Sequence, residues 1–234
     1  MPTILITGAN RGIGLELARQ YLADGWQVIA TCREPATADD LTALACPGLE
    51  VRTLDVTDHA AIDGLAASLG ESPIDVLLNN AGIIGPVPVA EHIERQHFGH
   101  LDYELWMQVL RTNTFGPVKL AEALLPNVLA GQQKKIVTLS STVGSIIERD
   151  TAAFAYATSK TAVNKAMRLL AAELRPQDVI VTLLCPGYVK TRLNFGTADI
   201  EPHDSVAGMR VLIDGFTLAD SGTFRRFNGE VIAW

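Results

Sequence analysis

The sequence predicts an α/β fold with a doubly wound parallel sheet of about seven strands and helices on both faces. Short, almost wholly apolar runs alternate with amphipathic segments of ten or more residues, which is the pattern of βαβ units. Glycine-rich or polar motifs directly follow several of these runs, where such sheets bind ligands. No internal repeat, low-complexity segment or linker interrupts the chain, so residues 1–234 are expected to form one domain.

The charge balance favours small molecules as partners. The chain has 19 Lys and Arg against 26 Asp and Glu, and no basic run that would bind nucleic acid or an anionic membrane surface. Its three widely spaced cysteines, Cys32, Cys46 and Cys185, contain no CxxC pair and suit a reducing compartment. No apolar run reaches the roughly 18 residues of a membrane span, and a strand predicted from Thr3 leaves no room for a signal peptide. We therefore expect a cytoplasmic protein.

The first predicted strand, residues 3–7, leads into a glycine-rich turn and then an amphipathic helix that ends near Ala23. The turn is Gly8-Ala9-Asn10-Arg11-Gly12-Ile13-Gly14. Glycines between a strand and a helix let backbone N–H groups approach a pyrophosphate at the positive end of the helix. The GxxxGxG spacing differs from the GxGxxG fingerprint, so a glycine-rich turn without a ligand is the alternative.

The second predicted strand, residues 25–31, ends without the acidic residue that would bind an unphosphorylated adenosine ribose. Cys32 and Arg33 stand there instead, and the first acid is Glu34. Together with Arg11 in the glycine turn, Arg33 would provide two cations for a ribose 2′-phosphate. The alternative is a pair of solvated surface arginines.

Polar motifs also follow the next two predicted strands. Residues 49–54 precede Asp55-Val56-Thr57-Asp58, in which Thr57 or Asp58 would cap the following helix. Residues 74–78 precede Asn79-Asn80-Ala81-Gly82. Ligands of a parallel sheet bind outside the carboxyl ends of its strands, and both motifs fall at such ends.

Residues 83–102 show no regular pattern and contain a group of histidines and acids, namely Glu91, His92, Glu94, His97 and His100. Their spacing matches no zinc signature, so a solvated loop is favoured over a metal site and no metal is expected. A helix is predicted from about Leu101, with Asn113 inside it. Asparagine usually costs helix stability at such a position, which points to a role for this side chain.

A fifth strand, residues 135–140, ends in the pair Ser140 and Ser141, and the helix predicted after it contains Tyr156 and Lys160. Residues four apart share a helix face, so the phenol and the ammonium are neighbours. A lysine charge lowers a tyrosine pKa from its usual value near 10, and proton transfer near neutral pH needs a shift of about two to three units. One cation falls short of that shift, and a second, such as an oxidised nicotinamide ring, would help to close the gap. The alternative is an ordinary surface pair.

The sixth and seventh strands complete the predicted sheet. Residues 179–185 form the sixth strand and precede Pro186-Gly187-Tyr188-Val189-Lys190-Thr191. A short loop over residues 192–203 and a helix to about Leu218 follow. The seventh strand is predicted over residues 224–232.

Taken together, five motifs resemble the short-chain dehydrogenase/reductase family in order and approximate spacing, from residue 3 to about residue 191. They are residues 7–14, Asn79-Asn80-Ala81-Gly82, Ser141, Tyr156-x-x-x-Lys160 and Pro186-Gly187. Further along, Asp214-Gly215, Ser221-Gly222 and residues 228–234 are similar to the C-factor and sniffer-like carbonyl reductase branch. The resemblance implies a Rossmann-type doubly wound sheet, which agrees with the strands predicted above.

The resemblance also implies catalytic roles for four residues. Tyr156 would be the general acid/base, and Lys160 would lower its pKa and hold the nicotinamide ribose. Ser141 would hydrogen-bond the substrate oxygen, and Asn113 would hold a water near Lys160. Ser140 competes with Ser141, but the family places its serine three residues before a glycine, as Ser141 and Gly144 are.

For the cofactor, the resemblance implies that Asp55 and Val56 lie at the adenine edge, Asn80 near the adenosine ribose, and Val189 and Thr191 at the nicotinamide carboxamide. Cys32 stands where NAD-dependent members carry an aspartate, and Arg11 and Arg33 match members that prefer NADP(H) over NAD(H). The full expected cofactor-binding set is Gly8, Asn10, Arg11, Gly12, Ile13, Gly14, Arg33, Asp55, Val56, Asn80, Ala81, Gly82, Tyr156, Lys160, Pro186, Gly187, Val189 and Thr191.

The expected function is NADPH-dependent reduction of a hydrophobic aldehyde or ketone, or alcohol oxidation in reverse. An apolar and aromatic pocket wall is expected from Ile83, Ile84, Val143, Phe154, Tyr188, Leu193 and Phe195. The alternative is a cofactor-binding signalling or regulatory protein with little turnover. A homodimer or homotetramer is expected, formed through helices around residues 101–125 and 153–175.

Overall fold

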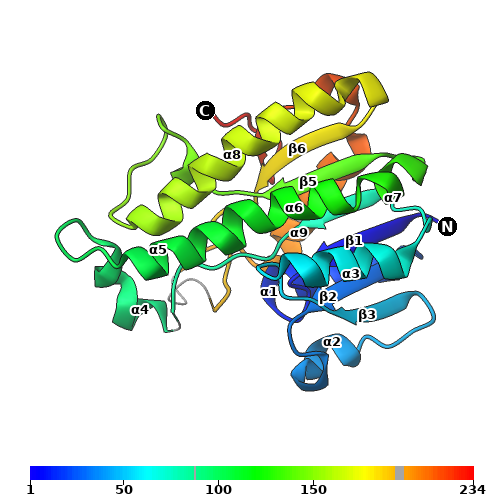
Figure 1. Ribbon diagram of the computed structural model, residues 1–234, viewed down its shortest axis with the longest axis horizontal. Coiled ribbons are helices and arrows are strands. Elements are labelled where there is room, and N and C mark those ends of the chain that lie inside the picture. Colours follow the sequence, from blue (N-terminus) through cyan, green and yellow to red (C-terminus); the bar gives the residue numbers. More distant parts are fainter. Residues whose placement is uncertain (87, 193–197) are drawn as a thin grey trace.

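A parallel sheet of seven strands runs through the described part of this computed structural model, residues 1–86, 88–192 and 198–234 (Figure 1). The strand order is β3-β2-β1-β4-β5-β6-β7, and every neighbouring pair is parallel. The strands are β1 (Thr3–Thr7), β2 (Gln27–Cys32), β3 (Leu49–Thr53), β4 (Val76–Asn79), β5 (Lys135–Leu139), β6 (Ile180–Cys185) and β7 (Phe224–Arg226). The chain builds outward from β1 to β3 on one side and from β4 to β7 on the other. The predicted doubly wound fold is therefore confirmed.

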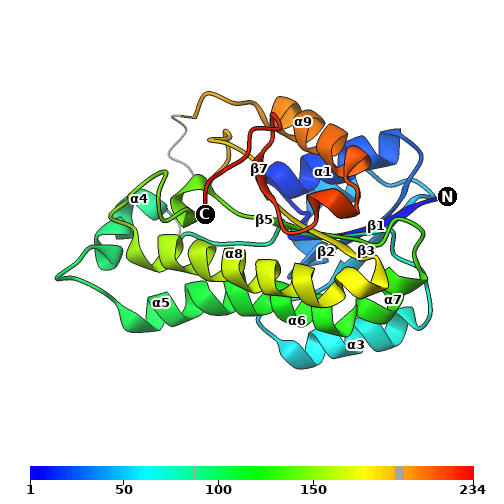
Figure 2. The same ribbon diagram turned by 90° about the horizontal axis from the view of Figure 1, so that it is seen from above.

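Helices cover both faces of the sheet. Figure 2 shows α1 and α9 on one face, and α3, α5, α6 and α8 on the other. The helices are α1 (Gly12–Ala23), α2 (Asp39–Thr42), α3 (His59–Leu69), α4 (Val89–His92), α5 (Tyr103–Leu110), α6 (Gly116–Ala123), α7 (Leu125–Ala130), α8 (Phe154–Leu174) and α9 (Pro202–Gly215). No helix in the described ranges combines the length and apolar character that a bilayer span requires.

The core consists of two apolar layers, one on each side of the sheet. Alternate residues of a strand point to opposite faces, so Leu5 belongs to the layer under α3, α6 and α8, whereas Ile4 and Ile6 belong to the layer under α1 and α9. All three side chains are fully buried. This double burial explains why the predicted strands are continuous apolar runs rather than alternating ones.

The structure differs from the sequence prediction mainly in two segments. Residues 83–102 are not wholly irregular, since α4 and the 3-10 helix η2 (Ile93–Gln96) form there. The strand predicted over 224–232 is also wrong in length. β7 ends at Arg226, the chain turns through Gly229 with φ 93°, and Val231 returns antiparallel beside Arg225. Glycine accommodates this positive φ, and the resulting turn is what shortens the strand.

Candidate active site

The glycine turn between β1 and α1 lies at the carboxyl end of the sheet, as expected. Gly8 and Gly12 have φ values of 66° and 55°, which are left-handed conformations that favour glycine. A Cβ at Gly14 would lie 2.4 Å from the Gly8 carbonyl oxygen. The turn is therefore tight because α1 packs directly on the backbone that precedes it.

Asn80, directly after β4, connects the glycine turn to the neighbouring strand. Its side-chain Nδ2 donates to the carbonyl oxygens of Thr7 (2.7 Å) and Gly8 (3.1 Å). In return, the Thr7 hydroxyl accepts from the backbone N–H groups of Asn80 (3.1 Å) and Ala81 (3.0 Å). Sequence reasoning missed Thr7, although its position directly before the turn was a usable signal.

The two candidate phosphate-binding arginines lie at the same edge of the sheet. The backbone N–H of Ala9 donates to the Thr31 carbonyl at 2.9 Å, which joins the glycine turn to β2. Arg11 lies two residues after Ala9, and Arg33 lies two residues after Thr31. Both residues are exposed, and neither side chain forms a hydrogen bond or ion pair with the described residues. Their guanidinium groups are therefore available for an anionic ligand.

Asp55 and Val56 follow β3. One Asp55 carboxylate oxygen accepts from the backbone N–H (2.8 Å) and the hydroxyl (2.7 Å) of Thr57. The Val56 side chain is buried, and its carbonyl would lie 2.8 Å from a Cβ at Gly116. Asp58, rather than Thr57, caps α3 by accepting from Ala61 N–H at 3.0 Å. Hydrogen bonds to Asp55 and Asp58 thus fix the chain between β3 and α3.

Tyr156 on α8 meets Ser141, which follows β5. Burial raises the pKa of Tyr156 to about 12, and a hydrogen bond with the Ser141 side chain acts in the opposite direction. The Lys160 ammonium lies 5.8 Å from the centre of the Tyr156 ring and donates to the Leu139 carbonyl at 2.9 Å. Burial lowers the pKa of Lys160 to about 8. Tyr156 and Lys160 are thus neighbours on α8, as their spacing predicted. In the protein alone, however, burial raises the pKa of Tyr156 by more than the lysine charge would lower it.

Ser140 and Ser141 differ in what their hydroxyl groups contact. The Ser140 hydroxyl is buried and donates to Asn164 Oδ1 at 2.5 Å, while Asn164 Nδ2 donates to the Gly144 carbonyl at 3.1 Å. A Cβ at Gly144 would lie 2.8 Å from Lys160 Cβ, so this turn packs directly on α8. Ser140 is thus a structural residue, and Ser141 is the serine beside the phenol. Asn164 was missed, although it lies one helical turn beyond Lys160.

Asn113 lies in a π-helical turn, η3 (Arg111–Phe115), between α5 and α6. Its buried amide accepts from Ile83 N–H at 2.9 Å and donates to the Ile83 carbonyl at 2.8 Å and to Ser159 Oγ at 2.9 Å. A Cβ at Gly82 would lie 3.3 Å from Asn113 Oδ1 and 3.6 Å from Lys160 Nζ. Single π turns occur frequently at functional sites, and this one brings Asn113, Gly82 and Lys160 together.

Gln96 in η2 is a site residue that sequence reasoning missed. It is only 1% exposed, its Nε2 donates to the Ile84 carbonyl at 2.8 Å, and its Oε1 accepts from Tyr156 N–H at 3.1 Å. It therefore joins the segment after β4 to the first turn of α8. Nothing in the spacing of residues 83–102 distinguished this glutamine from a solvated one.

The segment after β6 packs against the glycine turn. A Cβ at Gly12 would lie 3.3 Å from Thr191 Cγ2. Gly187 has φ 83°, and a Cβ there would lie 2.6 Å from Ile200 Cδ1. The Pro186 carbonyl accepts from Ser205 Oγ at 2.6 Å, and Val189 forms an isolated parallel β-bridge with Ile200.

The expected apolar pocket wall is placed only in part. Ile83, Ile84 and Val143 are half-buried, and Tyr188 is 46% exposed. Phe154 packs on the rings of Phe98 and Trp106 at centroid distances of 6.3 and 6.4 Å. Leu193 and Phe195 lie outside the described residues. Among the described residues, no three His, Cys, Asp or Glu side chains gather as metal ligands would.

Comparison with known proteins connects this geometry to a family. The family model for short chain dehydrogenase matches residues 2–199. The C-signal protein of Myxococcus xanthus is 33% identical over 72% of this chain and 98% of its own length. The carbonyl reductase Sniffer of D. melanogaster has a TM-score of 0.90 at 30% identity, with all of both chains covered. An NADPH-bound carbonyl reductase from chicken fatty liver has a TM-score of 0.90 at 33% identity, covering 100% of this chain and 99% of that one.

Proposed function

The chain belongs to the short-chain dehydrogenase family, and from this premise we propose that it reduces hydrophobic aldehydes or ketones with NADPH. Membership makes it an NAD(P)-dependent oxidoreductase of the carbonyl reductase type. The observation that carries the proposal is the meeting of the Tyr156 phenol, the Ser141 hydroxyl and the Lys160 ammonium at one end of α8. Alcohol oxidation is the same reaction in reverse.

The residues present fit a dinucleotide. The left-handed glycines and the close approach of Gly14 to Gly8 leave backbone N–H groups at the positive end of α1 for a pyrophosphate. In this proposal Asp55 and Val56 border the adenine, and Asn80 the adenosine ribose. Gly187, Val189 and Thr191 border the nicotinamide, together with the rest of the cofactor-binding set given above. When bound, the reduced nicotinamide supplies the hydride.

Ser141 and Tyr156 handle the carbonyl oxygen. Each hydroxyl donates a hydrogen bond to that oxygen and stabilises the negative charge that develops on it. Tyr156 then donates its proton, which it holds at neutral pH because burial keeps its pKa high. Lys160 is still protonated at pH 7 with a pKa of about 8, and its charge stabilises the phenolate left behind. Asn113, beside Lys160, would hold the water through which the proton is replaced.

Preference for NADPH over NADH is supported by the two exposed arginines. Arg11 and Arg33 form no ion pair with an acid among the described residues, and a 2′-phosphate would offer both of them charge-assisted hydrogen bonds. Cys32, at the end of β2, is buried and offers no carboxylate to a ribose hydroxyl. Related carbonyl reductases and dehydrogenases whose structures contain NADPH or NADP support this preference.

We place the protein in the cytoplasm as a homodimer or homotetramer. Large apolar side chains on α5, η3, α6 and α8 remain exposed, and they are the ones that a second copy would cover. They are Met107, Phe115, Val118 and Leu169. A second candidate function, a cofactor-binding regulatory protein, is favoured only by the similarity to C-signal.

The deciding experiment is an NADPH-oxidation screen over aldehydes, ketones, quinones and diketones, with Tyr156→Phe run in parallel. We expect at least one carbonyl compound to be turned over about 100 to 10,000 times faster by the wild type, because loss of a general acid has effects of that size. No difference between the two proteins across the panel would favour the regulatory role instead.

A further inference from the structure

The loop between β5 and α8 connects the two hydroxyl groups of the proposed site. We call residues 142–153 the serine loop, since it begins directly after Ser141 and ends at the helix that carries Tyr156. Its tip exposes two neighbouring apolar side chains, Ile146 and Ile147, each 77% exposed. A shift of the serine loop therefore changes the space next to both hydroxyl groups.

The first part of the serine loop is held by α8 and the second part by Glu148. The hydroxyl of Ser145 accepts from the backbone N–H groups of Ile147 (3.2 Å) and Glu148 (3.0 Å), which forms a compact turn. Apart from contacts inside the serine loop and with α8, the hydrogen bonds and ion pairs of residues 145–153 within the described chain all run through the Glu148 carboxylate. This side chain is the anchor of the outer serine loop.

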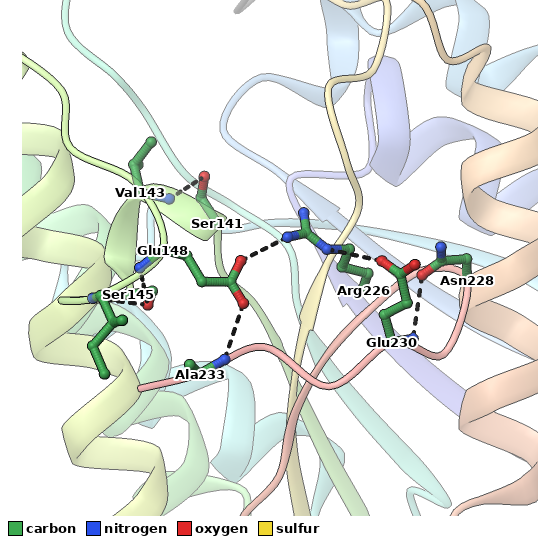
Figure 3. A network of polar contacts seen from close by, with 9 residues as sticks. Ser141, Val143, Ser145, Glu148, Arg226, Asn228, Glu230 and Ala233 are labelled. Atoms are coloured by element: carbon green, nitrogen blue, oxygen red, sulfur yellow. Dashed lines mark hydrogen bonds and ion pairs between the residues drawn. The ribbon is translucent and has the colours of Figure 1, made fainter.

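The partners of Glu148 come from the far end of the described chain. Arg226 Nη2 donates to one carboxylate oxygen at 2.6 Å, and the backbone N–H of Ala233 donates to the other at 3.0 Å (Figure 3). The Glu148 and Arg226 side chains are 23% and 34% exposed, so the pair is only partly screened by solvent. We call residues 224–234, which contain β7 and the chain returning beside it, the 224–234 segment.

The 224–234 segment is itself firmly attached to the sheet. β7 pairs with β6, with Arg226 in register with Cys185. The N–H of Ile232 donates to the Phe224 carbonyl at 2.8 Å, and the rings of Phe224 and Trp234 pack at 5.9 Å. Glu148 is therefore bonded to β7 and to the chain that returns beside it, and both are attached to the sheet.

Arg226 also acts on the end of β6, which borders the reacting groups. Burial raises the pKa of Cys185, and the positive charges of Arg226 and Lys160 act in the opposite direction. A second carboxylate, that of Glu230, lies 3.1 Å from Arg226 Nε (Figure 3). Arg226 thus joins one acid that belongs to the serine loop and one that does not.

We propose that Glu148 and Arg226 are positioning residues that fix the serine loop on the 224–234 segment and thereby set the size of carbonyl compound accepted. This inference rests on the proposed function, because it needs Ser141 and Tyr156 to face the substrate carbonyl. Loosening the serine loop raises KM for bulky apolar ketones and leaves small aldehydes and the cofactor bound as before.

The test compares Glu148→Ala, Glu148→Gln and Glu230→Ala on a homologous series of aliphatic ketones. For Glu148→Ala we expect KM of the bulkiest ketone to rise about tenfold, while kcat and the Kd of NADPH stay within about twofold. Glu148→Gln, which keeps the hydrogen-bond acceptor without the charge, should fall in between. Glu230→Ala is the matched control, because it also removes a carboxylate from Arg226 but does not touch the serine loop.

Hydrogen exchange separates this inference from the proposed function. Backbone amides of residues 147 and 148 should exchange about tenfold faster in Glu148→Ala than in Glu230→Ala, whether or not any carbonyl compound is turned over. If the wild type turns over no carbonyl compound, the proposed function is wrong, but the exchange rates of the two variants can still be compared. The positioning role is overturned if the two variants exchange alike, or if KM rises equally for small and bulky substrates.

Discussion

The two halves of the site are fixed by different kinds of contact. In the cofactor half, at the ends of β1, β2 and β4, backbone groups and short side chains are in direct contact, as with Gly14 on the Gly8 carbonyl and Asn80 on Thr7. In the carbonyl half, long side chains make the contacts between segments. Gln96 accepts from the Tyr156 N–H, and Glu148 accepts from Arg226. The cofactor half therefore depends on backbone space, and the carbonyl half on individual side-chain contacts.

The largest expected effect on cofactor binding comes from a substitution in the glycine turn. Gly14→Ala places a methyl group 2.4 Å from the Gly8 carbonyl oxygen and 2.5 Å from Asn80 Nδ2, and neither can move without opening the turn. We expect the Kd of NADPH to rise more than about 100-fold and the free energy of unfolding to fall by about 2–3 kcal/mol. Fluorescence titration and thermal unfolding measure these changes.

Gly64→Ala is the matched control for that variant. Gly64 is an exposed residue of α3 with nothing within 4 Å of an added Cβ. This substitution should stabilise the protein by about 0.5–1 kcal/mol, because alanine favours helix more than glycine does. NADPH binding by Gly14→Ala at the level of this control would show that the glycine turn does not hold the cofactor.

The next largest effect is expected from removing a positive charge in the cofactor half. Arg33→Ala should raise the Kd of NADPH about 10- to 100-fold and leave that of NADH nearly unchanged, since only the 2′-phosphate is affected. Arg33→Asp should go further and shift preference toward NADH. Arg149→Ala removes another exposed arginine and should change neither value. Equal kcat/KM with NADH and NADPH in the wild type would contradict the assignment of Arg11 and Arg33.

A pH profile tests the carbonyl half without a substitution. The pKa of Lys160 is lowered to about 8 by burial, so the ammonium is present below pH 8 and is lost as the pH rises through that value. Its charge favours the phenolate that forms when Tyr156 donates its proton. We expect kcat/KM for carbonyl reduction to fall about tenfold above pH 8. A rate that stays constant to pH 10 would be incompatible with this role of Lys160.

The smallest expected effect is on a single positioning contact. Gln96→Ala leaves the Ile84 carbonyl and the Tyr156 N–H without their side-chain partner, which should cost about 1–3 kcal/mol of unfolding free energy. We expect kcat/KM to fall about fivefold, with the Kd of NADPH within about twofold. Gln108→Ala, at an exposed position of α5, is the control. A matching loss of NADPH affinity in Gln96→Ala would mean that the two halves are not separate.

This contrast also explains what the sequence could predict. The seven strands, the glycine turn and the Tyr156–Lys160 pair are visible because apolar runs and spacings of four residues reflect local backbone geometry. Thr7 was missed but lies inside a recognisable motif. Asn164 was missed too, although it lies one helical turn beyond Lys160. Gln96 and the Glu148–Arg226 pair could not be predicted, since each contact depends on two segments meeting only after the fold has formed. The rise in the pKa of Tyr156 in the protein alone could not be predicted either, because burial is a property of the folded protein.

The central claim is that Tyr156 drives carbonyl reduction, while the glycine turn and the two arginines supply most of the binding energy for the cofactor. One paired measurement tests it most directly. It compares kcat for the best carbonyl substrate and the Kd of NADPH in Tyr156→Phe, with Tyr103→Phe as an exposed control. We expect kcat to fall about 100- to 10,000-fold while the Kd of NADPH stays within about twofold of the wild type. Turnover retained within about tenfold, or lost together with NADPH binding, would contradict the account.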